Sequence, residues 1–224
     1  MRELTDRALS TATVRGATYA DVRIVQQVDE SITVKSGRVE GVAAGESEGF
    51  GIRVLVDGAW GFASSHRLEA DEVDRVAAQA VRIARASATA LRRRVQLDDR
   101  PAAHGTYQTP VAEDPFKVSL ESKIGDLLAA DQLAAGVKGI AFTESTYAAQ
   151  RTHTIFAASD GSFTDQTITH VGSGIETNAI EGDEHQRRSY PDAGGGWQSA
   201  GYEYIRGLRL RTTSRRSPRR RSPC

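Results

Sequence analysis

The sequence predicts an α+β protein with antiparallel sheets flanked by helices, in which the order of a helix followed by strands occurs twice. Three observations carry this prediction. Some segments repeat apolar residues with a period near 3.6, others alternate apolar and polar residues with a period of 2. Tight turns such as Asp57-Gly58 join the strand-like runs, and long helical crossovers between them are missing. The sequence therefore favours an antiparallel fold over a doubly wound one.

The first predicted block covers residues 1–90. A short amphipathic helix that includes Leu4 ends near Gly16, and residues 22–34 alternate as half-buried strands. Ser36-Gly37 and Asp57-Gly58 each separate two strand-like runs, and Asp-Gly suits a hairpin because both turn positions need a positive φ. After about four antiparallel strands, residues 73–84 form one apolar stripe of a helix. The block is predicted as helix, strands, helix.

A connector over residues 91–118 and a second block over residues 119–205 follow. The connector holds three consecutive arginines and three prolines, which interrupt regular structure. The second block begins with a helix containing Leu120, Ile124, Leu127 and Leu128. Strands are then predicted over 139–149, 152–158, 163–171 and 174–180, with a hairpin turn at Asp160-Gly161.

The formal net charge of +0 hides two unlike segments. Residues 206–224 contain eight arginines and no acidic residue, so 21 basic and 29 acidic residues remain in 1–205. This Arg/Ser/Pro tail is predicted to be disordered or to be a frameshifted end that starts near Leu208. Arginine outnumbers lysine 25 to 4, which is typical of GC-rich coding sequence, and a shifted frame of such codons yields this composition.

Composition excludes several classes of protein. The chain of 224 residues is 39% hydrophobic and 26% charged, which is a globular composition with enough length for a core. No apolar run approaches the roughly 18 residues of a membrane span, and the N-terminus has no secretory signal pattern. A single cysteine, Cys224, excludes a disulfide framework and a cysteine-rich zinc knuckle.

Metal-ligand spacing is also missing. No two of the five histidines are three to five residues apart, as a zinc pair on a helix requires; they are His66, His104, His153, His170 and His185. His153 and His170 fall in predicted strands and could meet in space, although an ordinary strand histidine is the favoured interpretation. Glu181-Gly182-Asp183-Glu184-His185 is the densest set of possible ligands, and a solvated loop is favoured there over a cation site.

Other catalytic and nucleotide motifs are weak. The chain has no Gly-x-Ser-x-Gly nucleophile motif, and Gly172-Ser173-Gly174 lacks the third glycine and the helix of a nucleotide loop. Gly194-Gly195-Gly196-Trp197 is interpreted as a hinge or turn. The tail could bind nucleic acid by charge alone, but it has no aromatic residue for base stacking, so this function is ranked lowest.

Six segments in order resemble the TldD/PmbA family, whose members are also called modulators of DNA gyrase. They are Ala20-Asp21-Val22-Arg23, Ser36-Gly37-Arg38-Val39-Glu40-Gly41, Gly49–Leu55 with Ala59-Trp60-Gly61-Phe62, Glu113-Asp114-Pro115-Phe116, Gln186-Arg187-Arg188-Ser189-Tyr190-Pro191 and Ala200-Gly201-Tyr202-Glu203-Tyr204. The fifth segment favours the TldD branch. The resemblance covers about 185 residues and is expected to stop near Ile205.

The resemblance implies a cytoplasmic zinc peptidase that acts on small or unfolded peptides with a TldE/PmbA-like partner. In that family a His-Glu-x-x-x-His helix in the C-terminal domain holds the zinc, and its glutamate activates water. No His-Glu pair occurs in these 224 residues, so the resemblance transfers no catalytic residue and no metal ligand, and it leaves the substrate-binding residues unknown.

The sequence therefore predicts the non-catalytic, N-terminal portion of a TldD-like metallopeptidase, which contributes substrate cleft and dimer contacts and is truncated before the zinc motif. Such a chain is expected to be inactive alone and to hold no zinc. The alternatives are a stand-alone binding module for a TldE/PmbA-like partner and, ranked lowest, a basic-tailed nucleic-acid binder. The expected protein partner is a TldE/PmbA-like subunit or a second copy of the chain in a homo-oligomer. No membrane partner is expected.

Overall fold

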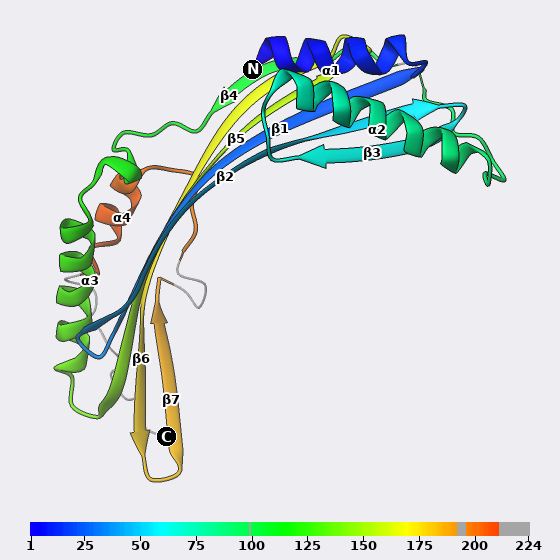
Figure 1. Ribbon diagram of the computed structural model, residues 1–224. Helices are drawn as coiled ribbons and strands as arrows, with labels where there is room; N and C mark the ends of the chain where they lie inside the picture. Colours follow the sequence, from blue (N-terminus) through cyan, green and yellow to red (C-terminus); the bar gives the residue numbers. More distant parts are fainter. Residues whose placement is uncertain (99, 192–195, 211–224) are drawn as a thin grey trace. The chain divides into compact units, whose positions relative to one another are not determined.

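The computed structural model describes residues 1–98, 100–191 and 196–210. Among these residues, seven strands join one sheet in the order β3-β2-β1-β5-β6-β4, with β7 paired to β6 outside this path (Figure 1). β2 pairs with β3 and β6 pairs with β7 in antiparallel register, whereas β4 runs parallel to β6. The α+β prediction is confirmed. The chain divides into two compact units, which are described separately.

Unit 1 comprises Met1–Gln27, Glu46–Gln108 and Thr152–Thr167. Two of its helices flank a run of strands along the chain. These elements are α1 (Arg2–Val14), β1 (Tyr19–Lys35), β2 (Arg38–Val56), β3 (Ala59–Ser65) and α2 (Ala70–Ala88), of which β1 and β2 continue into unit 2.

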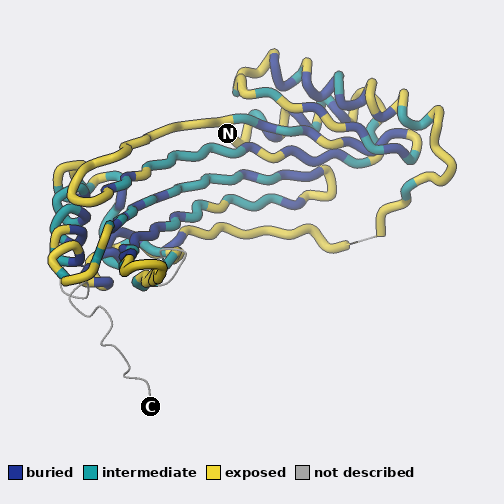
Figure 2. Tube along the Cα trace, turned by 90° about the horizontal axis from the view of Figure 1, so that it is seen from below, coloured by how far each residue is buried: buried dark blue, intermediate teal, exposed yellow. Residues whose placement is uncertain are grey.

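The core of unit 1 lies between the two helices and one face of the strands. Even-numbered residues of β1 and β2, among them Val22, Ile24 and Ile52, are buried against small residues of the helices such as Ala8 and Ala80. The helices of this unit alternate buried and exposed residues along their length, as an amphipathic helix does (Figure 2). The period-3.6 stripe predicted from Val73 to Ala84 is therefore the face of α2 that packs on the sheet.

Glycine permits the close approach of α2 to β3. A Cβ on Gly61 would collide with the carbonyl oxygen of Ala80 and with the backbone nitrogen of Ala84. No side chain larger than hydrogen fits between the helix backbone and the strand at this point.

Unit 2 comprises Val28–Gly45, Thr109–Arg151 and Ile168–Cys224. Its own elements are η1 (Pro115–Lys117), α3 (Leu120–Ala135), β7 (Glu184–Tyr190) and α4 (Tyr202–Leu208), together with parts of β1, β2, β5 (Ile140–Ala158) and β6 (Phe163–Glu181). Leu127 and Ala130 of α3 and Tyr202 of α4 share one apolar core with Tyr147 of β5 and Val171 of β6.

Polar side chains also lie in the core of unit 2. Lys123 is 1% exposed at its side chain and pairs with Glu30 at 2.6 Å, while its ammonium nitrogen lies 5.3 Å from the ring centroid of Tyr147. The carboxylate of Asp131 accepts a hydrogen bond from the backbone N–H of Gly37 at 2.5 Å. Four buried side-chain atoms have no hydrogen-bond partner among the described residues: Asp131 Oδ1, Thr143 Oγ1, Ser145 Oγ and the Tyr147 hydroxyl.

The strands are longer than the sequence predicted. About four strands were expected in residues 1–90, but three are present, because β1 runs unbroken from Tyr19 to Lys35 and β2 continues through residues 38–50. The runs 139–149 and 152–158 likewise form the single strand β5, and 163–171 and 174–180 form β6. Beyond the strand-like run 38–40 that follows the turn, residues 41–48 of β2 are all exposed, so they show no alternation from which a strand could be predicted.

The predicted turns are confirmed. Ser36 and Gly37 both have positive φ, at 46° and 76°, and Asp57 and Gly58 repeat this at 51° and 76°. Two successive residues with positive φ make the primed turn that matches the twist of a hairpin. Gly161, after Asp160, has a φ of 94°.

Two regions differ from expectation. The predicted connector contains a short strand, β4 (His104–Gln108), which is exposed throughout and pairs with residues 163–167 of β6. The predicted tail begins inside α4, and Leu208 and Leu210 are buried in the core of unit 2. Residues 211–224, which hold the rest of the predicted tail and Cys224, lie outside the described residues.

No helix in the described part of the chain is both long enough and apolar enough to cross a membrane.

Candidate functional site

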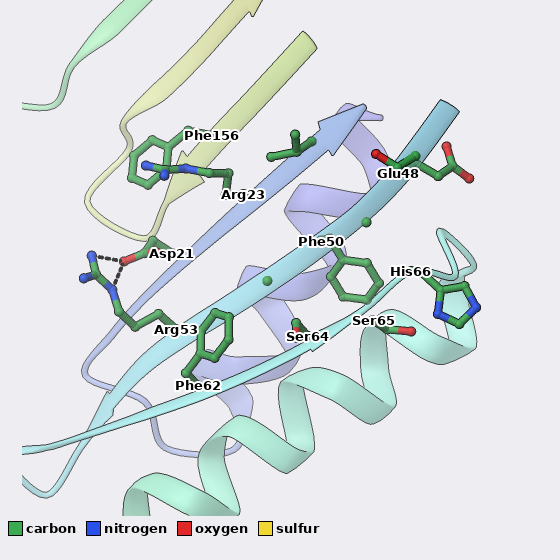
Figure 3. A pocket seen from close by; sticks show the side chains of 14 residues that line it. Asp21, Arg23, Glu48, Phe50, Arg53, Phe62, Ser64, Ser65, His66 and Phe156 are labelled. Atoms are coloured by element: carbon green, nitrogen blue, oxygen red, sulfur yellow. Dashed lines mark hydrogen bonds and ion pairs between the residues drawn. The ribbon is translucent and has the colours of Figure 1, made fainter. Parts of the chain in front are cut away.

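The strand face of unit 1 that the helices leave uncovered carries a pocket of about 660 Å³. Because side chains alternate across a strand, the odd-numbered residues of β1 and β2 point away from the helix-packed core. The pocket lies where four neighbouring strands meet on this face; the labelled residues in Figure 3 are Asp21, Arg23, Glu48, Phe50, Arg53, Phe62, Ser64, Ser65, His66 and Phe156. A volume of this size suits a small organic ligand or a short peptide.

Glycines of β2 allow an aromatic ring to lie close to the sheet. A Cβ on Gly51 would stand 2.8 Å from the Phe62 ring, so only glycine allows this ring to lie against the strand. Phe62 is nonetheless 58% exposed. The pocket therefore offers an accessible apolar surface.

One arginine of this face is already neutralised. Arg53 donates to the carboxylate of Asp21 from Nε at 2.9 Å and pairs with it from Nη2 at 2.7 Å. Its guanidinium lies 4.7 Å from the ring centroid of Trp60, and Tyr19 meets Trp60 edge to face at 5.8 Å. Burial, with a further contribution from the Asp21 charge, raises the pKa of Tyr19 to about 12, so its phenol stays neutral.

A second arginine has no acidic partner. The guanidinium of Arg23 lies 5.8 Å from the ring centroid of Phe156 on β5, and no carboxylate pairs with it among the described residues. Arg23 is exposed and lines the pocket. Its charge is thus available to a ligand.

The rim beyond β3 is held by the start of α2. Glu72 pairs with Arg75 at 2.7 Å. Hydrogen bonds from Arg75 and then Ser65 lower the pKa of Glu72 to about 2, so this carboxylate stays ionised at neutral pH. The arrangement anchors the chain after β3, where His66 is exposed at the pocket edge.

His153, one of the two strand histidines considered for a metal site, takes part in a hydrogen-bond chain that reaches Glu48 of the pocket lining. Its Nε2 lies 2.8 Å from Asp165, and its Nδ1 lies 3.4 Å from the side-chain oxygen of Gln26. The amide nitrogen of Gln26 in turn donates to Glu48 at 3.0 Å. His170, by contrast, packs edge to face on Trp197 at 6.5 Å.

The remaining sequence candidates do not assemble into a metal centre. Glu181 to His185 form the β6–β7 hairpin, in which His185 Nε2 lies 2.9 Å from the side-chain oxygen of Asn178. No group of three or more His, Cys, Asp or Glu side chains gathers within residues 1–98, 100–191 and 196–210. This donor set does not fit a zinc ion.

The glycine segments are structural where they are described. Gly172-Ser173-Gly174 lies inside β6, and Ser173 donates its hydroxyl proton to the carbonyl of Thr146 at 2.7 Å. The segment therefore does not form a nucleotide loop. Gly194 and Gly195 of the predicted hinge lie outside the described residues, whereas Gly196 has a φ of 59°.

Sequence reasoning missed the pocket. Its residues come from β1, β2, β3 and β5, and only the sheet order brings them together. The available signal was the odd-numbered series Asp21, Arg23 and Arg53, which places charge on the face opposite an apolar series, but this pattern alone indicates only a solvated face.

Comparison with known families finds two matches along the chain. Residues 20–84 match the family model described as PmbA/TldA metallopeptidase domain 1. Residues 113–217 match the model described as PmbA/TldA metallopeptidase central domain. Together these matches cover well over half of the chain. The second continues past Ile205, so the expectation that the resemblance stops there was wrong.

Two curated relatives are metalloproteases of archaea. The chain is 30% identical over 105 residues to one from Methanocaldococcus jannaschii, which covers 47% of this chain and 23% of that protein. It is 29% identical over 164 residues to one from Methanothermobacter thermautotrophicus, covering 73% of this chain and 35% of the relative. The chain thus spans about a third or less of the curated relatives it matches.

Solved structures share the fold. A putative modulator of a DNA gyrase from Thermotoga maritima superposes with a TM-score of 0.71 at 13% identity, covering 96% of this chain and 46% of that one. TldE from Thermococcus kodakarensis gives a TM-score of 0.62 at 14% identity, covering 84% of this chain and 43% of its own. With two family domains matched in order, the chain belongs to the TldD/PmbA metallopeptidase family.

Proposed function

We propose that this chain supplies a non-catalytic, peptide-handling portion of a TldD-type zinc metallopeptidase of the cytoplasm. The observation that carries the proposal is the pocket of unit 1, which combines an unpaired arginine with accessible aromatic surface. Peptides offer both apolar side chains and charged ends to such a surface. The zinc and the water-activating residue of the family would come from outside these residues, whose described side chains do not fit a zinc ion.

The blocks 1–90 and 119–205, joined by the connector 91–118, are proposed as successive domains of this portion. They correspond broadly to the first and central domain matches over residues 20–84 and 113–217. In this proposal unit 1, which holds the pocket, handles the peptide, and unit 2, which includes residues 38–45, contributes contacts with a partner subunit.

The proposal is tested by separating binding from cleavage. The purified chain is incubated with unstructured peptides, binding is measured by calorimetry, and products are sought by mass spectrometry. We expect binding without cleavage and no stoichiometric zinc by elemental analysis. Peptide cleavage that accompanies one tightly held zinc per chain would overturn the assignment as non-catalytic, and a lack of binding to any peptide would overturn the peptide-handling role.

A TldE/PmbA-like partner is supported by the exposed edge of β2 in unit 2. Residues 38–45 of β2 are exposed, and β3 pairs only with residues 50–56 of this strand. An unpaired strand edge is a template for a strand from another chain. This edge carries Val39 and Val42, which are 43% and 46% exposed.

The partner proposal predicts a position-specific loss of association. We expect Val42→Lys to weaken co-purification with a TldE-type subunit, because a charge on the edge opposes strand addition. Val14→Lys is the matched control, since Val14 is 85% exposed on α1. If both variants retained as much of the TldE-type subunit as the wild type does, the β2 edge would be excluded as the contact.

A further inference from the structure

We infer that the pocket of unit 1 is a recognition site for the C-terminal end of a peptide whose last side chain is apolar, with Arg23 as the partner of the terminal carboxylate. This inference rests on the proposed peptide-handling function and adds to it the part of the peptide that is recognised.

Arg23 supplies the cationic feature of the site. Of the four carboxylates and guanidiniums that line the pocket, Asp21 pairs with Arg53 and Glu48 accepts a hydrogen bond from Gln26. Arg23 has no carboxylate partner in the described part of the chain, so its charge is the one left for a ligand. Phe156 supports the guanidinium of Arg23 from one side at 5.8 Å, which leaves the N–H groups at its edge available. A guanidinium held in this way matches the geometry of a carboxylate, which it can bind with two parallel hydrogen bonds.

The residues around Arg23 favour a ligand that has an apolar group next to its carboxylate. Phe62 exposes 58% of its surface across the glycine strand, and Val25 and Phe156 also line the pocket. A ligand must therefore place apolar atoms next to its negative charge. A C-terminal apolar residue carries both groups on one Cα atom, whereas an internal Asp or Glu carries its charge on the side chain that would otherwise contact the apolar surface.

The ring of Phe62 lies over the glycine strand at the floor of the pocket. A Cβ at Gly51 of β2 would stand 2.8 Å from this ring, so only glycine lets the ring lie so close to the strand. Ser64 of β3, which is exposed and pairs in register with Gly51, also lines the pocket. The floor therefore offers the last side chain of the peptide an apolar surface with a hydroxyl beside it.

The inference is tested by calorimetry on the full chain with three N-acetylated probes. The first is acetyl-Ala-Ala-Phe with a free carboxylate, the second is its C-terminal amide, and the third is acetyl-Ala-Glu-Phe-Ala amide, whose only charge is internal. We expect the free acid to bind roughly three- to tenfold more tightly than the other two, which is the size of one partly exposed charge-assisted contact.

Substitutions test whether Arg23 causes the preference for the free C-terminal carboxylate over the amide. Arg23→Gln should lower the affinity for the acid to that of the amide and leave the amide unchanged. Arg82→Gln, an exposed arginine on α2 outside the pocket, should retain the preference. Phe62→Ala should weaken acid and amide by the same factor, because it removes apolar contact only.

Each other outcome overturns a definite statement. Equal affinity of the wild type for acid and amide, or a preference that survives Arg23→Gln in a folded variant, overturns the carboxylate assignment while peptide binding stands. Equal affinity for the acid and the internal-Glu probe overturns recognition of the C-terminal end. If none of the three probes binds, and the unstructured peptides used to test the proposed function do not bind either, the proposed function itself is overturned.

Discussion

The two units bury different chemistry. In unit 1, α2 packs on β3 through alanine, valine and a glycine. The buried polar side chains of this unit, on either face of its strands, all have partners; they are Thr5, Asp21, Glu72 and Ser162. In unit 2, α3 buries its own Lys123 and Asp131, and three hydroxyls of β5 are buried without a hydrogen-bond partner among the described residues.

The difference shows that one sheet can carry two kinds of core. Close contact with α2 in unit 1 requires small residues, so its stability depends on fit. Unit 2 tolerates polar groups that cost free energy when buried, so its stability depends on whether each charge keeps its partner. Substitutions matched between the units test this contrast.

The largest effect is expected at the buried ion pair of unit 2. Lys123→Met removes the partner of Glu30 and leaves its carboxylate uncompensated, so we expect a loss of about 3 kcal/mol in the free energy of unfolding. The control is Arg7→Met in unit 1, where the pair with Asp74 is exposed and little change is expected. Urea denaturation followed by circular dichroism measures both. Similar losses of unfolding free energy in Lys123→Met and Arg7→Met would contradict the idea that unit 2 depends more on its ion pair than unit 1 does.

A smaller loss is expected where α2 meets β3. Gly61→Ala introduces a Cβ into the backbone of α2, and overpacking of this kind costs about 1–3 kcal/mol. Gly41→Ala on β2 is the control, because a Cβ there meets nothing within 4 Å. The same denaturation experiment applies. A Gly61→Ala variant as stable as Gly41→Ala would show that fit does not limit unit 1.

The smallest effect concerns two tyrosines of unit 2. Tyr147→Phe removes a hydroxyl without a partner and should change stability by less than about 1 kcal/mol, in the stabilising direction. Tyr202→Phe removes a hydrogen bond of 3.2 Å to Asp126 and should cost about 1 kcal/mol. Thermal unfolding at neutral pH compares them. If Tyr147→Phe is the more destabilised variant, its hydroxyl has a partner in solution.

The same pair predicts an alkaline dependence. Burial raises the pKa of Tyr147 and of Tyr202 above the value of about 10 found in unfolded chains. The neutral phenols therefore contribute stability below pH of about 10, and this contribution declines as the pH rises above that value. Tyr147→Phe should lessen the decline, and an unchanged alkaline slope would contradict the assignment.

Local signals predicted the turns and the helices better than the strand lengths. Asp57-Gly58 and Ser36-Gly37 were found because positive φ at two successive positions restricts the residues allowed. The strand residues 41–48 were not predicted, because a strand exposed on both faces shows no period of 2. The strand β4 was missed for the same reason, since its five residues are exposed and its pairing lies with a distant segment.

The sequence by itself determined the fold class, the hairpin turns, the apolar stripe of α2 and the family, because these depend on residue type and short spacing. Only the tertiary structure decided that Arg53 forms an ion pair with Asp21, whereas the guanidinium of Arg23 lies against the ring of Phe156. The same holds for the ring of Phe62, which covers Gly51. The physical reason is that pairing between strands far apart in the chain places these side chains together, and no local preference encodes which charge keeps a partner.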